Sequence, residues 1–295
     1  MATMTATALK LITVLFSVIL PQKMWYPPGQ PVTVTNSSAQ PVQLVLTDFT
    51  GKPITTTNFT QLAAGASIDL STPFPQITSE GAWILYAAPK GTSVTDAPPK
   101  DFVGTPIVIE DLVGADMKPM VTHLVPLQYA KIDTDAGSMK ALFYYDAAPH
   151  TVESFLTLSA EGFYDSLVFH RIVPDFVIQG GDPTGTGTGG SGYHLDAEFN
   201  DKPHVEGVLS MARSDDPNSG STQFFICLNY ANTQQLDHKY TGFGRVIDGA
   251  DVYKKIGAST IADQTSGRPD KLTTIQSITV YPVTAAYNPY AIPQK

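Results

Sequence analysis

The sequence predicts a mainly β protein of two domains. Gly and Pro occur 23 times each among 295 residues, which favours many turns and short strands over long helices. Hydrophobic residues make up 42% and charged residues 15%, enough for each half to bury a core. The pattern changes near residue 115, where consecutive short strands give way to a mixture of strands and two helices.

The first part, residues 1–115, reads as a β-sandwich domain of unknown role. Apolar residues alternate with polar ones in short segments separated by polar turns, the pattern of an antiparallel sandwich. Gly81 to Tyr86 resembles late strands of immunoglobulin-like modules, so we expect an immunoglobulin-like domain. The expected strands are 32–35, 42–46, 68–70, 82–87 and 105–110.

The N-terminal apolar run Leu11 to Leu20 has two interpretations. It is too short to span a bilayer, so no transmembrane segment is expected. Its Ile, Val and Thr content favours a buried first strand. The alternative is a signal or anchor, although no small-residue cleavage pattern follows. A cytoplasmic location is favoured, and an exported or periplasmic one would follow if residues 1–20 act as a signal.

The segment 112–119 contains Gly and Pro and is expected to be the linker. Beyond it, residues 130–134 and 138–145 predict a strand pair. A helix should begin at Pro149, with Val152 and Phe155 on its buried face, and a second should span residues 250–256.

Charge and cysteine content exclude several classes of function. The net charge of -9 excludes nucleic acid as an expected partner. The single cysteine, Cys227, excludes an internal disulfide and lies in an apolar run, which predicts a buried, inert thiol. All four arginines follow residue 120, and an acidic region with so few of them is expected to use one for chemistry, for which Arg171 is the candidate. The four are Arg171, Arg213, Arg245 and Arg268.

Three blocks of the second part resemble the cyclophilin family of peptidyl-prolyl cis–trans isomerases. Residues 163–182 contain an aromatic residue, then F-H-R-I, then F-x-x-Q-G-G-D at the family's spacing. Residues 207–226 resemble its G-x-L-S-M-A and S-Q-F-F-I segments, and residues 236–246 its L-D-x-x-x-x-x-F-G-x-V segment. The resemblance spans about residues 123–282 and does not reach the first 115.

The resemblance implies an eight-stranded antiparallel barrel capped by two helices over residues 121–283, with residues 284–295 as a tail. It implies rotamase activity on X-Pro bonds of proline-containing peptides and unfolded proteins, a chaperone-like role in protein folding, without a cofactor or a metal. The main rival is a proline-peptide binding module without turnover. A third interpretation makes the first domain a docking unit for a protein or envelope partner.

Prolyl isomerisation needs a hydrogen-bond donor aimed at the prolyl nitrogen and requires no proton transfer. At the twisted state the prolyl nitrogen gains a lone pair, and a fixed charged donor stabilises it. Arg171 matches the family's catalytic arginine, with Gln179 and Phe176 beside it in the catalytic set. The substrate-binding positions implied by the resemblance are Val177, Ala212, Arg213, Gln223, Phe225, Leu236 and Tyr240.

Four positions depart from the family pattern. Val177 stands where many members have Met, Arg213 replaces Asn, and Tyr240 stands where some members have His. Gln235 occupies the position of a Trp in ciclosporin-sensitive members, so weak ciclosporin binding is expected.

Two other motifs are discounted. Gly185 to Gly190 satisfies G-x-G-x-x-G but lacks the preceding strand and following helix of a dinucleotide site. His194, Asp196 and Glu198, with His204 nearby, could ligate a metal if they alternate along a strand, but a solvated face is the favoured interpretation.

Overall fold

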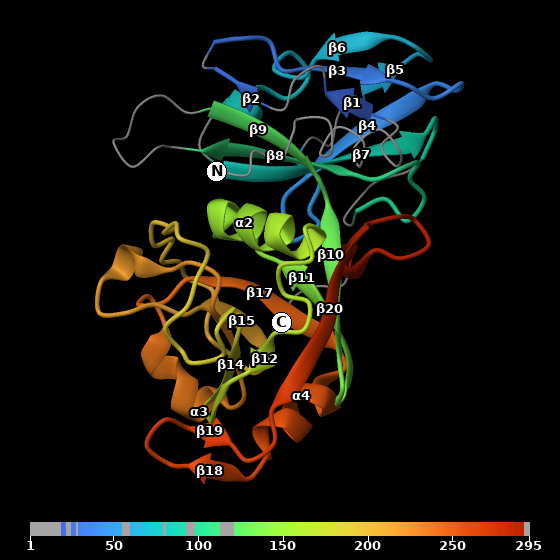
Figure 1. Ribbon diagram of the computed structural model, residues 1–295. Helices are drawn as coiled ribbons and strands as arrows, with labels where there is room; N and C mark the ends of the chain where they lie inside the picture. The colour runs from blue at the N-terminus through green and yellow to red at the C-terminus, as the bar shows by residue number, and fades with distance from the viewer. Residues whose placement is uncertain are drawn as a thin grey trace. The chain divides into compact units, whose positions relative to one another are not determined.

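The computed structural model describes residues 19–21, 25–27, 29–54, 60–78, 81–92, 98–112 and 121–291 (Figure 1). The chain forms two compact units, one from residues 1–128 with 282–295, the other from residues 129–281.

The first unit contains two antiparallel sheets. The larger has the strand order β2-β9-β8-β7-β4-β5 and the smaller β1-β3-β6. Their bounds are β1 Ile19–Pro21, β2 Trp25–Tyr26, β3 Thr33–Asn36, β4 Val42–Thr47, β5 Thr60–Leu62, β6 Ser67–Asp69, β7 Gly81–Pro89, β8 Ile107–Leu112 and β9 Val121–Pro126, with 3-10 turns η1 Pro75–Thr78 and η4 Pro289–Ala291.

Both sheets contribute to one buried core, as a sandwich requires. Val34 of the smaller sheet joins Leu44, Leu85 and Ile109 of the larger one in a single apolar cluster. Each of these side chains is at most 1% exposed, so the core lies between the two sheets. The immunoglobulin-like assignment is not confirmed and stays a prediction.

The compact units divide the chain at different residues from those expected from sequence. β9 pairs with β8 in register Ile109 to Leu124 and so belongs to the first sheet. Tyr290, in the expected tail, is buried and donates to the Gln128 carbonyl, which groups residues 282–291 with the first unit. Residues 113–119 of the expected linker and residues 11–18 of the apolar run lie outside the described residues, whereas Leu112 is the last residue of β8. The boundaries 1–115, 121–283 and 284–295 stay a prediction.

The second unit is built on one antiparallel sheet that curls into a nearly closed barrel (Figure 1). Its strand order is β12-β20-β10-β11-β17-β15-β16-β14-β13. The bounds are β10 Gln128–Thr134, β11 Gly137–Phe143, β12 Val168–Phe169, β13 Arg171–Val173, β14 Val177–Gly180, β15 Val208–Met211, β16 Phe224–Cys227, β17 Gly242–Asp248 and β20 Thr273–Pro282, with a separate hairpin of β18 Ile261–Asp263 and β19 Arg268–Pro269.

The sheet closes at His170. β12 and β13 are the two outer strands of the sheet, yet only this residue separates them along the chain. The two edges must therefore meet, and the His170 N–H donates to the Gln179 carbonyl where they do so. Counted as one strand broken at His170, β12 and β13 make the barrel eight-stranded, which confirms the predicted barrel.

The two expected helices form, and a short third accompanies them. α2 spans Pro149–Ala160, α4 spans Ala250–Gly257 and α3 covers only Tyr230–Thr233; 3-10 turns η2 and η3 span Pro217–Ser219 and Gln234–Leu236. Phe155 of α2 packs against Phe143, Phe224 and Phe243, with ring centroids 5.2–5.7 Å apart. The α2 face therefore covers an aromatic core of the barrel.

Among the described residues, no helix has the length and apolar character needed to cross a bilayer.

Candidate active site

The hairpin of β13 and β14 fixes the first two functional side chains. Arg171 and Gln179 are direct partners across the antiparallel pair, so their side chains leave the same face. Asp175 adopts a left-handed backbone with φ 58°, and Phe176 N–H donates to the Val173 carbonyl, which closes the tight turn between the strands. The number of residues between the F-H-R-I and F-x-x-Q segments is therefore set by the length of this hairpin.

The same face carries the apolar residues of the neighbouring strand. Val177 lies two positions from Gln179 on β14, and Phe225 of β16 is the direct partner of Gln179. Val177, Phe225 and Leu236 are at most 8% exposed and belong to one cluster, against which the half-buried Phe176 and Tyr240 pack. A firm apolar wall results beside the Arg171 guanidinium.

These residues line a groove of about 430 Å³. Its lining comprises His170, Arg171, Phe176, Val177, Gln179, Gly185, Thr186, Gly187, Ala212, Arg213, Phe225, Leu236, Tyr240, Ser266 and Arg268.

A chain of hydrogen bonds orients the guanidinium. Arg171 Nη1 donates to Gln179 Oε1 at 3.1 Å, and Gln179 Nε2 donates to Gln223 Oε1 at 2.9 Å. Gln223 Nε2 in turn donates to the carbonyls of Gly187 and Gly189, at 3.1 and 2.8 Å. Because every acceptor in the chain is held by a donor, both amides have one defined orientation.

The glycine-rich loop is held by the buried Asp182 carboxylate. Asp182 accepts hydrogen bonds from the backbone N–H groups of Thr184, Gly187 and Gly189. Burial acts to raise the pKa of Asp182, but these bonds outweigh it and lower the pKa to about 2. The preceding Gly181 has φ +84°, and a side chain there would collide with the Thr222 carbonyl oxygen. The Q-G-G-D motif thus has three roles. Its glutamine orients Arg171, its second glycine allows close backbone packing, and its aspartate anchors the loop.

Arg213 is tethered at the far side of the apolar wall. Its guanidinium donates to the carbonyls of Lys239 and Ser214, at 3.1 and 2.8 Å, and lies 4.4 Å from the Tyr240 ring centroid. Tyr240 meets Phe225 edge-on, with centroids 5.8 Å apart. Arg213 therefore fixes Tyr240 by a cation–π contact.

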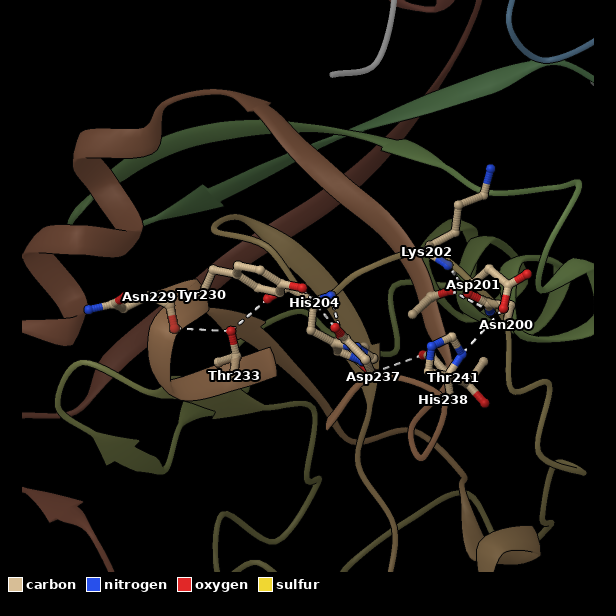
Figure 2. A network of polar contacts seen from close by, with 12 residues as sticks. Asn200, Asp201, Lys202, His204, Asn229, Tyr230, Thr233, Asp237, His238 and Thr241 are labelled. Carbon is tan, nitrogen blue, oxygen red and sulfur yellow. Dashed lines mark hydrogen bonds and ion pairs between the residues drawn. The ribbon is translucent and has the colours of Figure 1, made fainter. Parts of the chain in front are cut away.

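A buried polar pair supports the apolar wall from behind. His204 Nδ1 lies 3.0 Å from Asp237 Oδ1, and its ring stacks on Phe225 with centroids 6.3 Å apart. Figure 2 shows the two side chains turned toward one another, with Tyr230 on the other carboxylate oxygen at 3.0 Å. A carboxylate only accepts, so His204 Nδ1 carries a proton. Burial lowers the pKa of His204, against the opposing effect of Asp237.

The structure brings together nine of the ten residues expected from sequence. Only Gln223 does not line the groove, and it contacts the set through Gln179. Sequence reasoning missed a second group of lining residues, among them His170, Ser266 and Arg268. His170 stands inside the signature, but Arg268 had no signal except the scarcity of arginine.

The discounted motifs are engaged in structural roles. Gly185 to Gly190 is the loop around Asp182. Glu198 accepts hydrogen bonds from the His150 and Thr151 N–H groups and caps α2, and Cys227 is fully buried, which raises the pKa of its thiol. Within the described ranges, no three acidic, histidine or cysteine side chains are grouped to hold a metal ion.

The second unit is thus a nearly closed antiparallel barrel with a groove in which the Arg171 guanidinium lies beside an apolar hollow. The family model for cyclophilin type peptidyl-prolyl cis-trans isomerases matches residues 129–280, so the chain belongs to that family.

Two curated relatives and one solved structure illustrate the similarity. Peptidyl-prolyl cis-trans isomerase ppi1 of Schizosaccharomyces pombe is 46% identical over 145 residues, covering 47% of this chain and 90% of the relative. A peptidyl-prolyl cis-trans isomerase of Synechococcus elongatus is 47% identical over 119 residues, covering 40% and 80%. A cyclophilin type isomerase of Cryptosporidium parvum, crystallised in the presence of the dipeptide ala-pro, has 34% identity and a TM-score of 0.49, covering 52% and 98%.

Proposed function

We propose that this chain is a peptidyl-prolyl cis–trans isomerase that accelerates rotation about X-Pro bonds in peptides and unfolded proteins, and so assists their folding. The observation that carries the proposal is the Arg171 guanidinium held beside the apolar wall of Phe176, Val177, Phe225 and Leu236. The reaction needs no covalent intermediate and no proton transfer.

Arg171 supplies the electrostatic part of the mechanism. Rotation has a barrier of about 18–20 kcal/mol because amide resonance is lost as the bond twists. The prolyl nitrogen then becomes pyramidal, and its lone pair accepts a hydrogen bond that the planar ground states cannot accept. Gln179 aims the guanidinium, so the donor needs no reorganisation during rotation. A preorganised donor of this kind contributes about 3–4 kcal/mol.

The apolar wall supplies the positional part. It holds the proline ring while the preceding residue and its carbonyl rotate. Val177 and Phe225 are fixed by strand pairing, and Tyr240 closes the end of the hollow with an aromatic face. Ala212 and Arg213 lie where an extended peptide would run along the groove.

The test is the isomerisation rate of a proline tetrapeptide measured by protease-free NMR exchange. Arg171→Ala should lower kcat/KM about 100- to 1000-fold with an unchanged melting temperature. Lys254→Ala, which removes a cation from the exposed face of α4, is the matched control and should leave the rate unchanged. Wild-type activity that survives in Arg171→Ala would contradict the mechanism.

The same experiment separates the enzyme from a binding module. A module would bind the peptide and shift its NMR signals without exchange between the cis and trans forms. The docking role of the first domain, for a protein or envelope partner, stays a prediction. A pull-down with the full chain carrying Trp25→Ala would test it, because Trp25 is 44% exposed and stacks on His123 at 3.7 Å.

A further inference from the structure

The groove carries a concentration of positive charge that the prolyl mechanism does not require. Three of the four arginines of the chain line it, Arg171, Arg213 and Arg268, and no acidic side chain does. The whole chain has a net charge of -9, so the groove has the opposite sign to the protein around it. One guanidinium is enough to donate to the prolyl nitrogen, and that of Arg213 holds Tyr240, so Arg268 needs another explanation.

None of the three groove arginines is neutralised within the part of the chain that the structure describes. No ion pair found there includes any of these three guanidinium groups. The Arg213 guanidinium donates to backbone carbonyls, whereas the Arg268 side chain makes one hydrogen bond, from Nη1 to the Gly185 carbonyl at 3.3 Å. Arg268 is also exposed, so its remaining donors can reach a ligand.

The hairpin of β18 and β19 fixes Arg268 beside Arg171. Ile172 N–H donates to the Gly267 carbonyl at 2.8 Å, and Gly267 lies against the aliphatic stem of Arg171. The turn is held by Asp263, which accepts from Thr265 N–H at 2.9 Å and from Ser266 Oγ at 2.7 Å. Asp263 is therefore engaged within the turn, and Asp182 is engaged by the glycine loop, so neither carboxylate pairs with Arg268.

A buried polar group faces the same end of the groove. His170 is 5% exposed and lines the groove, and its side chain interacts with the Val168 backbone. Its ring nitrogens make no hydrogen bond of full geometry among the described residues, so a ligand or water at this end of the groove can still satisfy the buried imidazole. This imidazole, with Arg171, Arg268 and the loop at Thr186, makes a polar, cationic lobe next to the apolar hollow.

We propose that this lobe binds an anionic side chain next to the proline, so that the isomerase prefers substrates with an acidic or phosphorylated residue flanking the X-Pro bond. The inference rests on the proposed function and deepens it by naming the substrate class. Arginine forks match carboxylate and phosphate oxygens, and phosphate presents more charge and more acceptors than a carboxylate. Arg268 distinguishes anionic from neutral substrates, whereas Arg171 donates to the prolyl nitrogen of every substrate.

The experiment compares matched proline peptides with Gln, Glu, Lys or phosphoserine at the residue before or after the proline. We expect wild-type kcat/KM for the Glu peptide to exceed that for the Gln peptide about fivefold at one of the two positions, with Lys below Gln. The phosphoserine arm separates the two sources of negative charge: a larger gain than with Glu indicates phosphate recognition. The preference should shrink as salt is added.

Arg268→Gln should reduce the Glu-to-Gln ratio toward one, with the Gln peptide as the internal reference in each variant. Lys271→Gln removes the same charge from an exposed position that does not line the groove, and should keep the wild-type ratio. A ratio of one at both positions in the wild type, or a ratio that Arg268→Gln leaves unchanged, overturns the inference. Absence of turnover with every peptide would instead count against the isomerase, and peptide affinities measured by calorimetry would then test the preference alone.

Discussion

At the scale of single residues, the site depends on groups that do not line the groove. Gln223 does not line the groove, yet it joins Gln179 to the glycine loop and so fixes the direction in which Arg171 points. His204 is stacked behind Phe225 and fixed by Asp237. Both act through a neighbour, and both are therefore positioning residues.

Gln223→Ala should lower kcat about 3- to 10-fold while KM changes little. The amide of Gln179 would lose its acceptor, and Arg171 would sample orientations that miss the prolyl nitrogen, whereas the apolar hollow would stay intact. Steady-state kinetics with one proline peptide measures the effect. Gln276→Ala, an exposed position on β20, is the control. An equal loss in KM and kcat with a lowered melting temperature would indicate a structural role instead.

The barrel should lose stability as the pH falls through 6.5 and below. Burial lowers the pKa of both His170 and His204, so the unfolded chain takes up protons near the ordinary pKa of about 6.5 while the folded barrel resists them. The pKa of His170 is also affected by the charges of Asp182, Arg171 and Arg268. The pKa of His204 is also affected by those of Asp237 and His238. This contribution is fully present above pH 6.5 and is lost as the folded pKa values are approached.

Urea unfolding between pH 8 and pH 5.5, followed by circular dichroism, measures this dependence. The free energy of unfolding should decline below pH 6.5, and less steeply in His170→Gln, which removes one of the two groups. A flat profile, or one that the substitution does not change, would refute the assignment.

The resemblance to the cyclophilin family predicts groove residues on strands, such as Val177 and Phe225, and also residues outside strands, such as Ala212 and Tyr240. It misses Arg268, because the quoted motifs do not include the hairpin of β18 and β19. Arg268 is 97 residues from Arg171 in the sequence. The two are brought together where the Ile172 N–H donates a hydrogen bond to the Gly267 carbonyl. Glu198 was expected on a solvated face, but its partners are N–H groups of α2 that no local pattern indicates.

At the scale of elements, the groove combines strand residues of β13, β14 and β16 with residues from η3, from the loop at 182–190 and from the hairpin of β18 and β19. The bounds of α2 and α4 and of strands β3, β4, β7, β8, β10 and β11 follow from the residue pattern within a few residues, whereas the other barrel strands were expected only from the family resemblance. The sequence does not predict that β9 joins the larger sheet of the first unit. Its pairing with β8 depends on the tertiary fold, which a short apolar run does not reveal.

Asp182→Asn should destabilise the barrel by about 2 kcal/mol and also lower kcat. The charged acceptor of the loop amides would become a neutral amide whose N–H₂ group cannot accept from them. The loop carbonyls of Gly187 and Gly189 that hold Gln223 would then loosen. Because the folded pKa of about 2 lies below the ordinary 3.8, the stabilisation is present above pH 4 and lost as the pH falls toward 2.

Urea unfolding at pH 7 measures the loss. Asp201→Asn, with a side chain 99% exposed, is the matched control and should change the stability by less than about 0.5 kcal/mol. Equal stability of Asp182→Asn and wild type would show that the carboxylate does not anchor the loop.

At the scale of the whole molecule, each unit has a core of its own, so we predict that they unfold separately. Ile109 is fully buried in the first unit and Ile132 in the second, and truncating either to Ala should cost about 2–5 kcal/mol in its own unit. The chain provides separate probes, since both tryptophans, Trp25 and Trp83, lie in the first unit and the groove lies in the second.

The experiment follows tryptophan fluorescence and isomerase activity across the same urea series. Ile109→Ala should move the fluorescence midpoint to lower urea and leave the activity midpoint and kcat/KM in place, because no groove residue belongs to its core. Ile132→Ala should move the activity midpoint to lower urea and leave the fluorescence midpoint in place. If either substitution moved both midpoints together, the chain would unfold as one cooperative unit, and the first domain would then act on the isomerase through stability as well as through any partner that it binds.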